Sequence, residues 1–541
     1  MKKIGFVCLC LTLIFNIVFF AVEPERQKEA IWKAEYSQEV QNLEKLCKVW
    51  GYTKYTHPAF LLGKKDWDEE LLKLIPVVSE AKAKEVNDIL HEWFVSLGEV
   101  DYGTSRKKTL PPEDKLIVQA DTSWIHEDYL RAKLTEDLSE LGPIPNIDRS
   151  KAPVQFIGSA FVAMPNFGNE RDYDQMNYSV PAERLLGLFR VWNVMEYYCP
   201  YLDILDESWE AQIQPFIAKM LEGNDQHSYE MTISALGAKL QDAHVRLFTK
   251  DLIKRPLFDE WGIYTIPTEL MYVENQVVVY NPDTEKLQAG DIILELDGVT
   301  VEELIANRLE YISVTEENKL MFAVFPLLLR SHQPEMELKI LRDGKEQTIL
   351  IEGKKDVDQL YLWHIPTEVS HELLEGNIGL INPQKLEEGE IPQIMEKFRN
   401  TDGLIIDLRQ YPGYSFYHEI SSYLGDSEKI FVQVAFPSQS IPGTFVTDSM
   451  KRMAESWEYR GEIVVLTNEM SLSNAEYTVM SLQNAENVTV MGEETIGADG
   501  NVARLPLPGN IELLFTSLGV HTPEMGQTQR VGLTPDIEVY P

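Results

Sequence analysis

Cysteine is scarce in this chain of 541 residues. Of its four cysteines, Cys8 and Cys10 lie in an apolar run at the N-terminus, which leaves Cys47 and Cys199 for the rest of the molecule. Two cysteines are too few for a disulfide framework. Each lies in an aromatic-rich helical pattern, where a buried free thiol is the usual state.

The sequence also lacks the patterns of metal and nucleotide chemistry, and it has little positive charge. It contains no Cys/His cluster, H-E-x-x-H, P-loop or Rossmann glycine pattern, so no metal and no cofactor is expected. Lysine and arginine number 49 against 86 aspartates and glutamates, which gives a formal net charge of −37. This charge excludes an electrostatic nucleic-acid binder. The surplus acid is spread along the chain, where its commonest role is solubility.

The long hydrophobic run of this chain lies at the N-terminus. Met1-Lys2-Lys3 precedes an almost continuous apolar stretch over residues 4–22, and polar residues follow. A short basic region before an apolar core is typical of an export signal. We therefore predict an exported protein, periplasmic or extracellular, with residues 1–22 as signal peptide. The same run is long enough to act as a single membrane anchor if it is not cleaved.

Aromatic residues reveal a repeat in the first half of the chain. A helix with a Tyr-x-x-Pro end and a following Trp-led helix occur twice at a constant offset of 142 residues: Val49, Trp50, Tyr55, Pro58 and Trp67 correspond to Val191, Trp192, Tyr197, Pro200 and Trp209. Identical spacing favours a duplicated helical unit. The second copy closes with Asp242-Ala243-His244, whereas the first has no histidine there. The Pro-rich and charged sequence between the copies predicts an irregular connection with short strands.

From about residue 256 the pattern changes to strands. The segment A-G-D-I-I-L-E-L-D-G over residues 289–298 predicts a glycine turn, a buried strand and an Asp-Gly hairpin, and Asp343-Gly344 predicts a second hairpin. Strands and helices alternate from residue 376 to the end. Such alternation predicts a mostly parallel α/β domain, whose functional groups gather at the carboxyl ends of the strands.

Ser473 is the first candidate for chemistry. It lies in T-N-E-M-S-L-S-N-A-E over residues 467–476, which predicts a strand, a tight turn and a helix. A hydroxyl at such a turn lies next to backbone N–H groups of a helix N-terminus, which is the geometry that acyl transfer requires of a nucleophile and an oxyanion site. The structural alternative is a simple helix cap.

Candidates for an oxyanion site and a base lie elsewhere in the chain. The segment D-L-R-Q-Y-P-G-Y over residues 407–414 follows an apolar strand, and its Pro-Gly turn either directs a backbone N–H at a substrate carbonyl or is an ordinary strand exit. His244 is the candidate base, with His418 and His521 as rivals in or near the α/β domain. A histidine at a helix end is otherwise a cap or a core residue.

The order of these motifs resembles the tail-specific, C-terminal-processing serine peptidases. The resemblance covers roughly residues 185–541 and rests on helical L-x-D-x-H, A-G-D-I-I-L-E-L-D-G, D-L-R-x-x-P-G, S-x-S-N-A-E and a closing V-G-L-T-P-D. It implies a multidomain α/β protein with a crotonase-like (ClpP/crotonase) core, an inserted PDZ-like domain that grips an extended chain by β-addition, and an N-terminal helical part. It also implies Ser473 as nucleophile, and Gly413, Tyr414 and Asn474 as oxyanion residues.

Departures from the family pattern narrow the mechanism. The segment G-A-D over residues 497–499 carries alanine where the Ser–Lys branch has its lysine. The chain is therefore similar to the histidine-using branch of tricorn protease, which implies His244 as general base. Gln529 occupies the place of the glutamate that orients this histidine, and glutamine cannot stabilise an imidazolium by charge. Asp499 and Glu476 are the candidates for the missing carboxylate, with Asp499 preferred.

The predicted protein is an exported serine peptidase that hydrolyses unstructured polypeptides or C-terminal tails. Two alternatives stay open: a catalytically impaired, peptidase-like scaffold that binds polypeptides, and an esterase or amidase for small substrates. The predicted organisation is a signal peptide at 1–22, a helical unit at 23–110, an irregular connection at 111–181, a helical unit carrying His244 at 182–255, a PDZ-like domain at 256–354 and an α/β core at 355–541.

Overall fold

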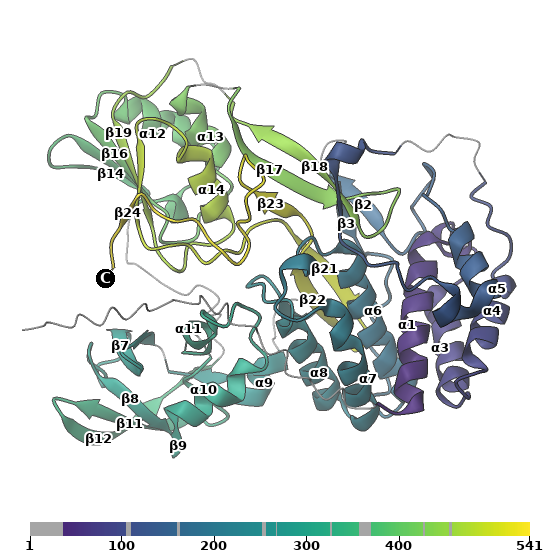
Figure 1. The fold of residues 1–541 in the computed structure, drawn as a ribbon. Helices are drawn as coiled ribbons and strands as arrows, with labels where there is room; N and C mark the ends of the chain where they lie inside the picture. The colour runs from purple at the N-terminus through teal and green to yellow at the C-terminus, as the bar shows by residue number, and fades with distance from the viewer. Residues whose placement is uncertain are drawn as a thin grey trace, which may run out of the picture.

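The chain folds into a multidomain α/β protein, which we describe from a computed structural model (Figure 1). Helices of the first half lie on one side, the strand-rich middle part and the C-terminal sheet on the other. The structure describes residues 36–103, 110–158, 163–250, 256–266, 268–324, 327–355, 369–425, 428–453 and 457–540. The predicted export signal at residues 1–22 lies outside these residues. No helix within the described ranges is both long and apolar enough to cross a bilayer.

The first helical unit contains α1 (Gln38–Thr56), α2 (Pro58–Leu61), α3 (Trp67–Ser79), α4 (Val86–Ser96) and α5 (Glu127–Glu140). Helices α1 and α3 begin at capping side chains: Ser37 accepts from the N–H of Val40 at 3.3 Å, and Asp66 accepts from the N–H groups of Asp68 and Glu69 at 3.0 Å. Short strands accompany the helices: β1 (Leu116–Val118) precedes α5, and β2 (Gln155–Gly158) and β3 (Ala163–Asn166) follow it.

The second helical unit contains α6 (Pro181–Tyr198), α7 (Ile213–Glu222) and α8 (Gln226–Ala238) and repeats a contact of the first. The Trp50 indole N–H donates to the carbonyl of Trp67 at 2.9 Å, and the Trp192 indole N–H donates to that of Trp209 at 3.3 Å. Position 193 corresponds to position 51 at the same offset. A Cβ on Gly51 would lie only 1.6 Å from Oδ1 of Asn193, so α1 and α6 cross at equivalent positions and glycine makes the close approach feasible.

A buried cluster of charges joins the two helical units. Lys54 Nζ lies 2.6 Å from Glu170, and Arg190 lies 2.8 Å from Asp68 and 3.1 Å from Glu170. All four side chains are at most 1% exposed. Burial disfavours every one of these charges: it raises the pKa of the Asp68 carboxyl and lowers that of the Lys54 ammonium. The charges are therefore stable only as a set.

The middle part is a sheet in the order β12-β11-β8-β7-β6, with β9 beside β8 and two helices. Its elements are β6 (Thr268–Val273), β7 (Gln276–Pro282), β8 (Ile292–Leu296), β9 (Val299–Thr300), α10 (Val301–Leu309), α11 (Lys319–Val324), β11 (Glu335–Arg342) and β12 (Lys345–Glu352). A smaller sheet of β5 (Tyr264–Thr265), β10 (Arg330–Ser331) and β13 (Lys354–Lys355) borders it, and α9 (Pro256–Trp261) precedes it. Both predicted Asp-Gly hairpins are present, with positive φ at both central residues as type I′ turns require.

The C-terminal part is built on a sheet in the order β14-β15-β16-β19-β20-β24, parallel except for β14. Its strands are β14 (His371–Leu374), β15 (Ile378–Ile381), β16 (Gly403–Asp407), β19 (Glu462–Thr467), β20 (Val488–Gly492) and β24 (Ile537–Glu538). Helices α12 (Ile391–Phe398), α13 (Tyr417–Ser421) and α14 (Asn474–Leu482) accompany it. The predicted parallel α/β alternation is thus confirmed.

Two further sheets connect the C-terminal part to the helices. The hairpin β17 (Ile430–Pro437) and β18 (Thr444–Lys451) lies between β1 and β23 (Gly519–His521). Strands β21 (Val502–Leu507) and β22 (Ile511–Thr516) leave the core and pair with β4 (Arg246–Thr249), which follows His244. This differs from the single 355–541 unit expected from the sequence.

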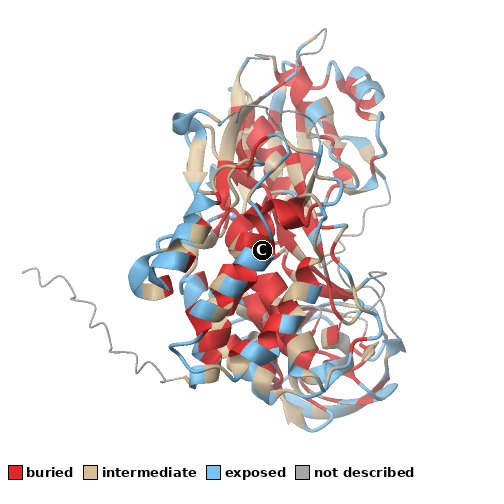
Figure 2. Cartoon of the chain, turned by 90° about the vertical axis from the view of Figure 1, so that its right-hand side faces the viewer, coloured by how far each residue is buried: buried red, intermediate tan, exposed pale blue. Residues whose placement is uncertain are grey.

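Buried hydrophobic residues of β21 and β22 pack together with those of the helical units. Residues Leu505, Leu513 and Phe515 belong to the same hydrophobic cluster as the helical units. Figure 2 shows the buried faces of the helices turned toward this shared interior. Cys47 and Cys199 are buried free thiols, as predicted.

Replacing Lys54 by Met tests the charge cluster. We expect the free energy of unfolding to fall by about 3 kcal/mol, because the buried acids Asp68 and Glu170 lose one of their two cationic partners. The same substitution at Lys73, which is 66% exposed and pairs with Glu70, should change it by less than about 0.5 kcal/mol. Urea denaturation followed by tryptophan fluorescence measures both, and equal losses would contradict a central role for the cluster.

Candidate active site

Ser473 lies at the strand–turn–helix junction that the sequence predicts. It follows β19 and immediately precedes α14, at the carboxyl edge of the parallel strands. Its backbone has φ 53° and ψ −113°, the conformation of the first central residue of a type II′ turn, which normally requires glycine. A non-glycine residue held in this region is strained, and such strain concentrates at functional sites.

The carboxylate of Glu476 holds the Ser473 turn. It accepts from the N–H of Ser473 at 3.1 Å, and from the N–H groups of Gly497 and Ala498 at 2.8 and 2.9 Å. The Thr495 hydroxyl is a fourth donor. Burial raises the pKa of Glu476, and these hydrogen bonds oppose that rise. Glu476 therefore fastens the nucleophile turn to the loop after β20; it is not the acid that orients His244.

His244 lies between α8 and β4 with two partners on the same ring nitrogen. Nδ1 is 3.0 Å from the Thr516 hydroxyl and 3.4 Å from Oδ1 of Asp242. Asp242 also accepts from the backbone N–H of His244 at 3.0 Å. Burial alone would raise the pKa of the Asp242 carboxyl, but its hydrogen bonds to His244 and Thr516 and the charge of His244 lower it. Asp242 is therefore an ionised carboxylate placed at His244.

The middle part also contacts this segment. The hydroxyl of Ser313, which follows α10, accepts from the N–H of Asp242 at 3.1 Å and donates to the carbonyl of Gly237 at 3.1 Å. The His244 segment is thus held by groups from two other stretches of sequence, Ser313 of the middle part and Thr516 of β22.

A chain of contacts connects His244 to Ser473. Thr516, the partner of His244, lies against Gly500, where a Cβ would approach its methyl to 2.9 Å. Two residues earlier, the carbonyl of Ala498 accepts from the N–H of Ser473 at 2.7 Å. Ala243, Leu472 and Ala498 belong to one hydrophobic cluster. Among the described residues, Ser473 is not a hydrogen-bond partner of the His244 ring; apo geometry of this kind is commonly looser than that of the substrate complex.

Asp499 and Gln529 contact each other and not His244. The N–H of Asp499 donates to Oε1 of Gln529 at 3.0 Å. Burial and the charge of Glu476 hold the pKa of Asp499 well above its usual range. A carboxyl with a raised pKa cannot stabilise an imidazolium as well as Asp242 can. The preference for Asp499, then Gln529, as partner of His244 is therefore corrected to Asp242.

The rival histidines have other surroundings. His418 on α13 packs against Tyr417, with ring centroids 4.0 Å apart and ring planes tilted by 40°. His521 on β23 is buried beside Tyr201, with centroids 6.4 Å apart. Burial lowers the pKa of both rings. Neither is recorded in contact with Ser473 among the described residues.

The oxyanion assignment also needs a correction. The N–H of Gly413 donates to the carbonyl of Pro383 at 2.9 Å, so it does not face a substrate. The amide of Asn474 donates to the carbonyl of Tyr414 at 2.9 Å, which joins the Pro-Gly turn to the start of α14. The backbone N–H of Asn474, at the first position of this helix, has no acceptor within the helix. It is a better candidate donor than Gly413.

Two residues of the site were missed as functional by sequence reasoning. Asp242 was present in the L-x-D-x-H motif itself, two residues before the histidine. Thr516 carried no local signal, because it reaches His244 only through the pairing of β22 with β4. Among the described residues, no group of three His, Cys, Asp or Glu side chains is arranged to bind a metal.

The C-terminal part of the chain is similar to known proteins. Residues 377–539 match the model of peptidase family S41, so the C-terminal domain belongs to that family. The carboxy-terminal-processing protease of Bartonella bacilliformis is 27% identical over 180 residues, which cover 31% of this chain and 39% of that protein. The match thus spans well under half of that relative.

The chain is similar to solved structures to differing extents. The crystal structure of mature CPAF has a TM-score of 0.50 at 14% identity, covering 66% of this chain and 92% of CPAF. The photosystem II D1 C-terminal processing protease has a TM-score of 0.41 at 18% identity, covering 67% of this chain and 94% of that one.

Replacing Asp499 by Asn tests the protonation of the buried pair. The folded state binds the proton of Asp499 more tightly than the unfolded chain does, so stability falls as pH rises above the unfolded pKa of about 4. The variant should be more stable than the wild type at about pH 8 and equal to it near pH 4. Thermal unfolding across this range measures the difference. Asp283→Asn, at a 72% exposed carboxylate, is the matched control; a loss of stability at high pH in Asp499→Asn would refute the raised pKa.

Proposed function

We propose that this chain is an exported serine endopeptidase that hydrolyses peptide bonds in unstructured polypeptides or C-terminal tails. Ser473 is the nucleophile, His244 the general base and Asp242 the residue that orients the base. The observation that carries the proposal is that neighbouring side chains hold both candidate residues in place. Glu476 accepts a hydrogen bond from the strained Ser473 turn, and Asp242 and Thr516 contact Nδ1 of His244. The family of the C-terminal domain supports it.

The proposed reaction is acyl transfer in two halves. With Nδ1 occupied by Asp242 and Thr516, Nε2 of His244 is the nitrogen left to take the proton of the Ser473 hydroxyl as its oxygen attacks the scissile carbonyl carbon. The imidazolium then protonates the departing amine, and the C–N bond breaks. Water, deprotonated by the same nitrogen, hydrolyses the acyl-serine and restores the hydroxyl. Asp242 stabilises the imidazolium in both halves.

The proposal includes a role for the other parts. We interpret the C-terminal part as a crotonase-like core and the middle part as a PDZ-like domain. Strand β6 is an edge strand of the middle sheet, and α11 packs beside it. An extended chain can add to such an edge through main-chain hydrogen bonds.

Replacing Ser473 by Ala tests the nucleophile. Cleavage of a disordered polypeptide such as casein should fall to background, while circular dichroism and the melting temperature stay close to those of the wild type. Electrophoresis of the digest gives the readout. A variant that still cleaves would show that another residue is the nucleophile.

Replacing Asp242 by Asn tests whether Asp242 or Asp499 orients His244. The amide keeps the acceptor for the His244 N–H but removes the charge, so kcat should fall about a thousandfold or more. The matched variant Asp499→Asn should retain activity within about threefold, since its carboxyl lacks contact with His244 and is already disposed to be neutral. A larger loss of kcat in Asp499→Asn than in Asp242→Asn would identify Asp499 as the residue that orients His244.

A second function is favoured by specific observations. Ala498 stands where the Ser–Lys branch has its lysine, and no hydrogen bond joins Ser473 to His244 among the described residues. A scaffold that binds polypeptides without turnover would fit both. Reaction with a fluorophosphonate decides: labelling in the wild type but not in Ser473→Ala favours the peptidase, and no labelling with polypeptide binding intact favours the scaffold.

A further inference from the structure

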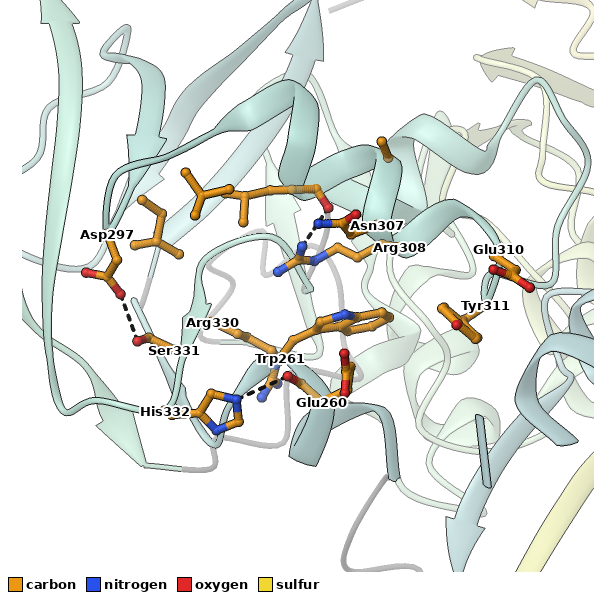
Figure 3. Close-up of a pocket in the computed structure, with 14 residues that line it drawn as sticks. Glu260, Trp261, Asp297, Asn307, Arg308, Glu310, Tyr311, Arg330, Ser331 and His332 are labelled. Atoms are coloured by element: carbon orange, nitrogen blue, oxygen red, sulfur yellow. Dashed lines mark hydrogen bonds between the residues drawn. The ribbon is translucent and has the colours of Figure 1, made fainter. Parts of the chain in front are cut away.

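A cavity of about 450 Å³ lies where three parts of the chain meet. Its lining comes from the stretch between α6 and α7, from residues 315–317 between α10 and α11, and from the stretch between β23 and β24. It shares no lining residue with the larger cavity inside the middle part, which Figure 3 shows. Its volume is that of a site for a small ligand.

The walls of this cavity contact both segments of the candidate active site. The backbone N–H of Arg530 donates to the carbonyl of Gly497 at 2.6 Å, in the loop after β20. On the opposite wall, the N–H of Asp206 donates to Oε1 of Gln241 at 3.1 Å, and the Asp206 carboxylate accepts from Nε2 of Gln241 at 2.6 Å. Gln241 directly precedes the segment that carries the candidate base. A ligand in the cavity therefore lies between the supports of the nucleophile and of the base.

Three polar atoms of the lining are buried without a hydrogen-bond partner in the described part of the chain: Nε2 of Gln529, Nε of Arg530 and Oγ1 of Thr315. Gln529 is only 1% exposed, and its Oε1 already accepts from the N–H of Asp499. A buried donor that lacks an acceptor costs free energy. Two of the three atoms are N–H donors and the third is a hydroxyl, so the set matches a ligand that brings an acceptor oxygen.

The charges of the lining determine which kind of acceptor fits. Three carboxylates and one guanidinium line the cavity. Arg530 pairs with Asp206 at 2.8 Å, and Lys319, outside the lining, pairs with Glu316 at 2.6 Å. Glu317 has neither an ion pair nor a hydrogen bond with any described residue. The surplus of negative charge disfavours an anionic ligand, and Glu317 leaves one carboxylate available to a cation.

We propose that this cavity binds a basic amino-acid residue, with its carbonyl oxygen against Gln529 and Arg530 and its cationic side chain against Glu317. An amide carbonyl accepts hydrogen bonds without adding negative charge, and an ammonium group offers three donors to a carboxylate. A lysine within a polypeptide and a small basic amide share this chemistry. Binding requires no turnover at Ser473, so the proposal stands apart from the proposed peptidase function.

Calorimetric titration of the full chain carrying Ser473→Ala tests the proposal, so that no peptide is cleaved. The probes are acetyl-lysine methylamide, acetyl-norleucine methylamide, which lacks the ammonium group, and n-pentylamine, which lacks the carbonyls. The lysine probe should bind at least about tenfold more tightly than either of the others, since each of them leaves buried or charged groups of the site unpaired.

The tripeptide acetyl-Ala-Lys-Ala-amide distinguishes the two sources of the ligand. Affinity equal to that of the lysine probe identifies a small basic amide as a sufficient ligand. Much tighter binding of the tripeptide identifies a segment of polypeptide.

Variants locate the binding. Glu317→Gln removes the unpaired charge and keeps the size of the side chain, so the lysine and norleucine probes should bind to it equally. Glu302→Gln, at an exposed position of α10 outside the lining, should bind as the parent does. Val531→Trp fills the cavity from its wall without removing a polar group and should abolish binding, whereas Val539→Trp, at a 48% exposed position outside the lining, should not. Equal affinity of the parent for the lysine and norleucine probes, absence of binding, or full binding by Val531→Trp would each overturn the proposal.

Discussion

One buried carboxylate, that of Glu476, holds the loops of the catalytic edge together. Ser473 has a backbone conformation that disfavours a side chain, and the loop after β20 has no regular secondary structure at residues 495–499. Four donors from these two segments converge on Glu476. The strain at Ser473 is affordable because this set of charge-assisted hydrogen bonds offsets it. Without it, neither the turn nor the loop would have a defined position relative to the other.

The candidate base, His244, is far from Ser473 in sequence and is held in place by other residues. His244 follows the helical part, but its partner Thr516 lies at the end of β22, in a strand that leaves the C-terminal domain to pair with β4. Ser313 from the middle part holds the N–H of Asp242. The middle part therefore contacts the segment that carries His244 directly.

The sequence predicts the features that depend on local patterns. The strand, turn and helix around Ser473 and the two Asp-Gly hairpins follow from alternation and turn chemistry over a few residues. The offset of 142 residues marked positions that make the same indole hydrogen bond in both units. Local sequence patterns were sufficient to identify Ser473 as the candidate nucleophile and to predict the parallel strands around it.

Other features depend on tertiary contacts, and the sequence could not provide them. Whether Gly413 points its N–H outward depends on Pro383, thirty residues away, which accepts it. The choice between Asp242 and Asp499 depends on where β22 brings Thr516. The buried ion cluster of the helical units joins Lys54 and Asp68 to Glu170 and Arg190. No periodic pattern in the sequence predicts this cluster. The error at Gly413 came from a partner that is distant in sequence, whereas Asp242 lies two residues before His244 and was overlooked in the motif itself.

The electrostatics of the site separate its carboxyl groups by role. Asp242 is held ionised by His244 and Thr516, whereas burial and the charge of Glu476 favour protonation of Asp499. Pairs of acids whose surroundings push their pKa values apart have different functions. In the proposed reaction, a proton taken from Ser473 creates positive charge on the imidazole, and an acid that stays ionised lowers the energy of that charge. Asp242 meets this requirement next to the ring, so the loss of a family glutamate at Gln529 does not leave His244 without a counter-charge.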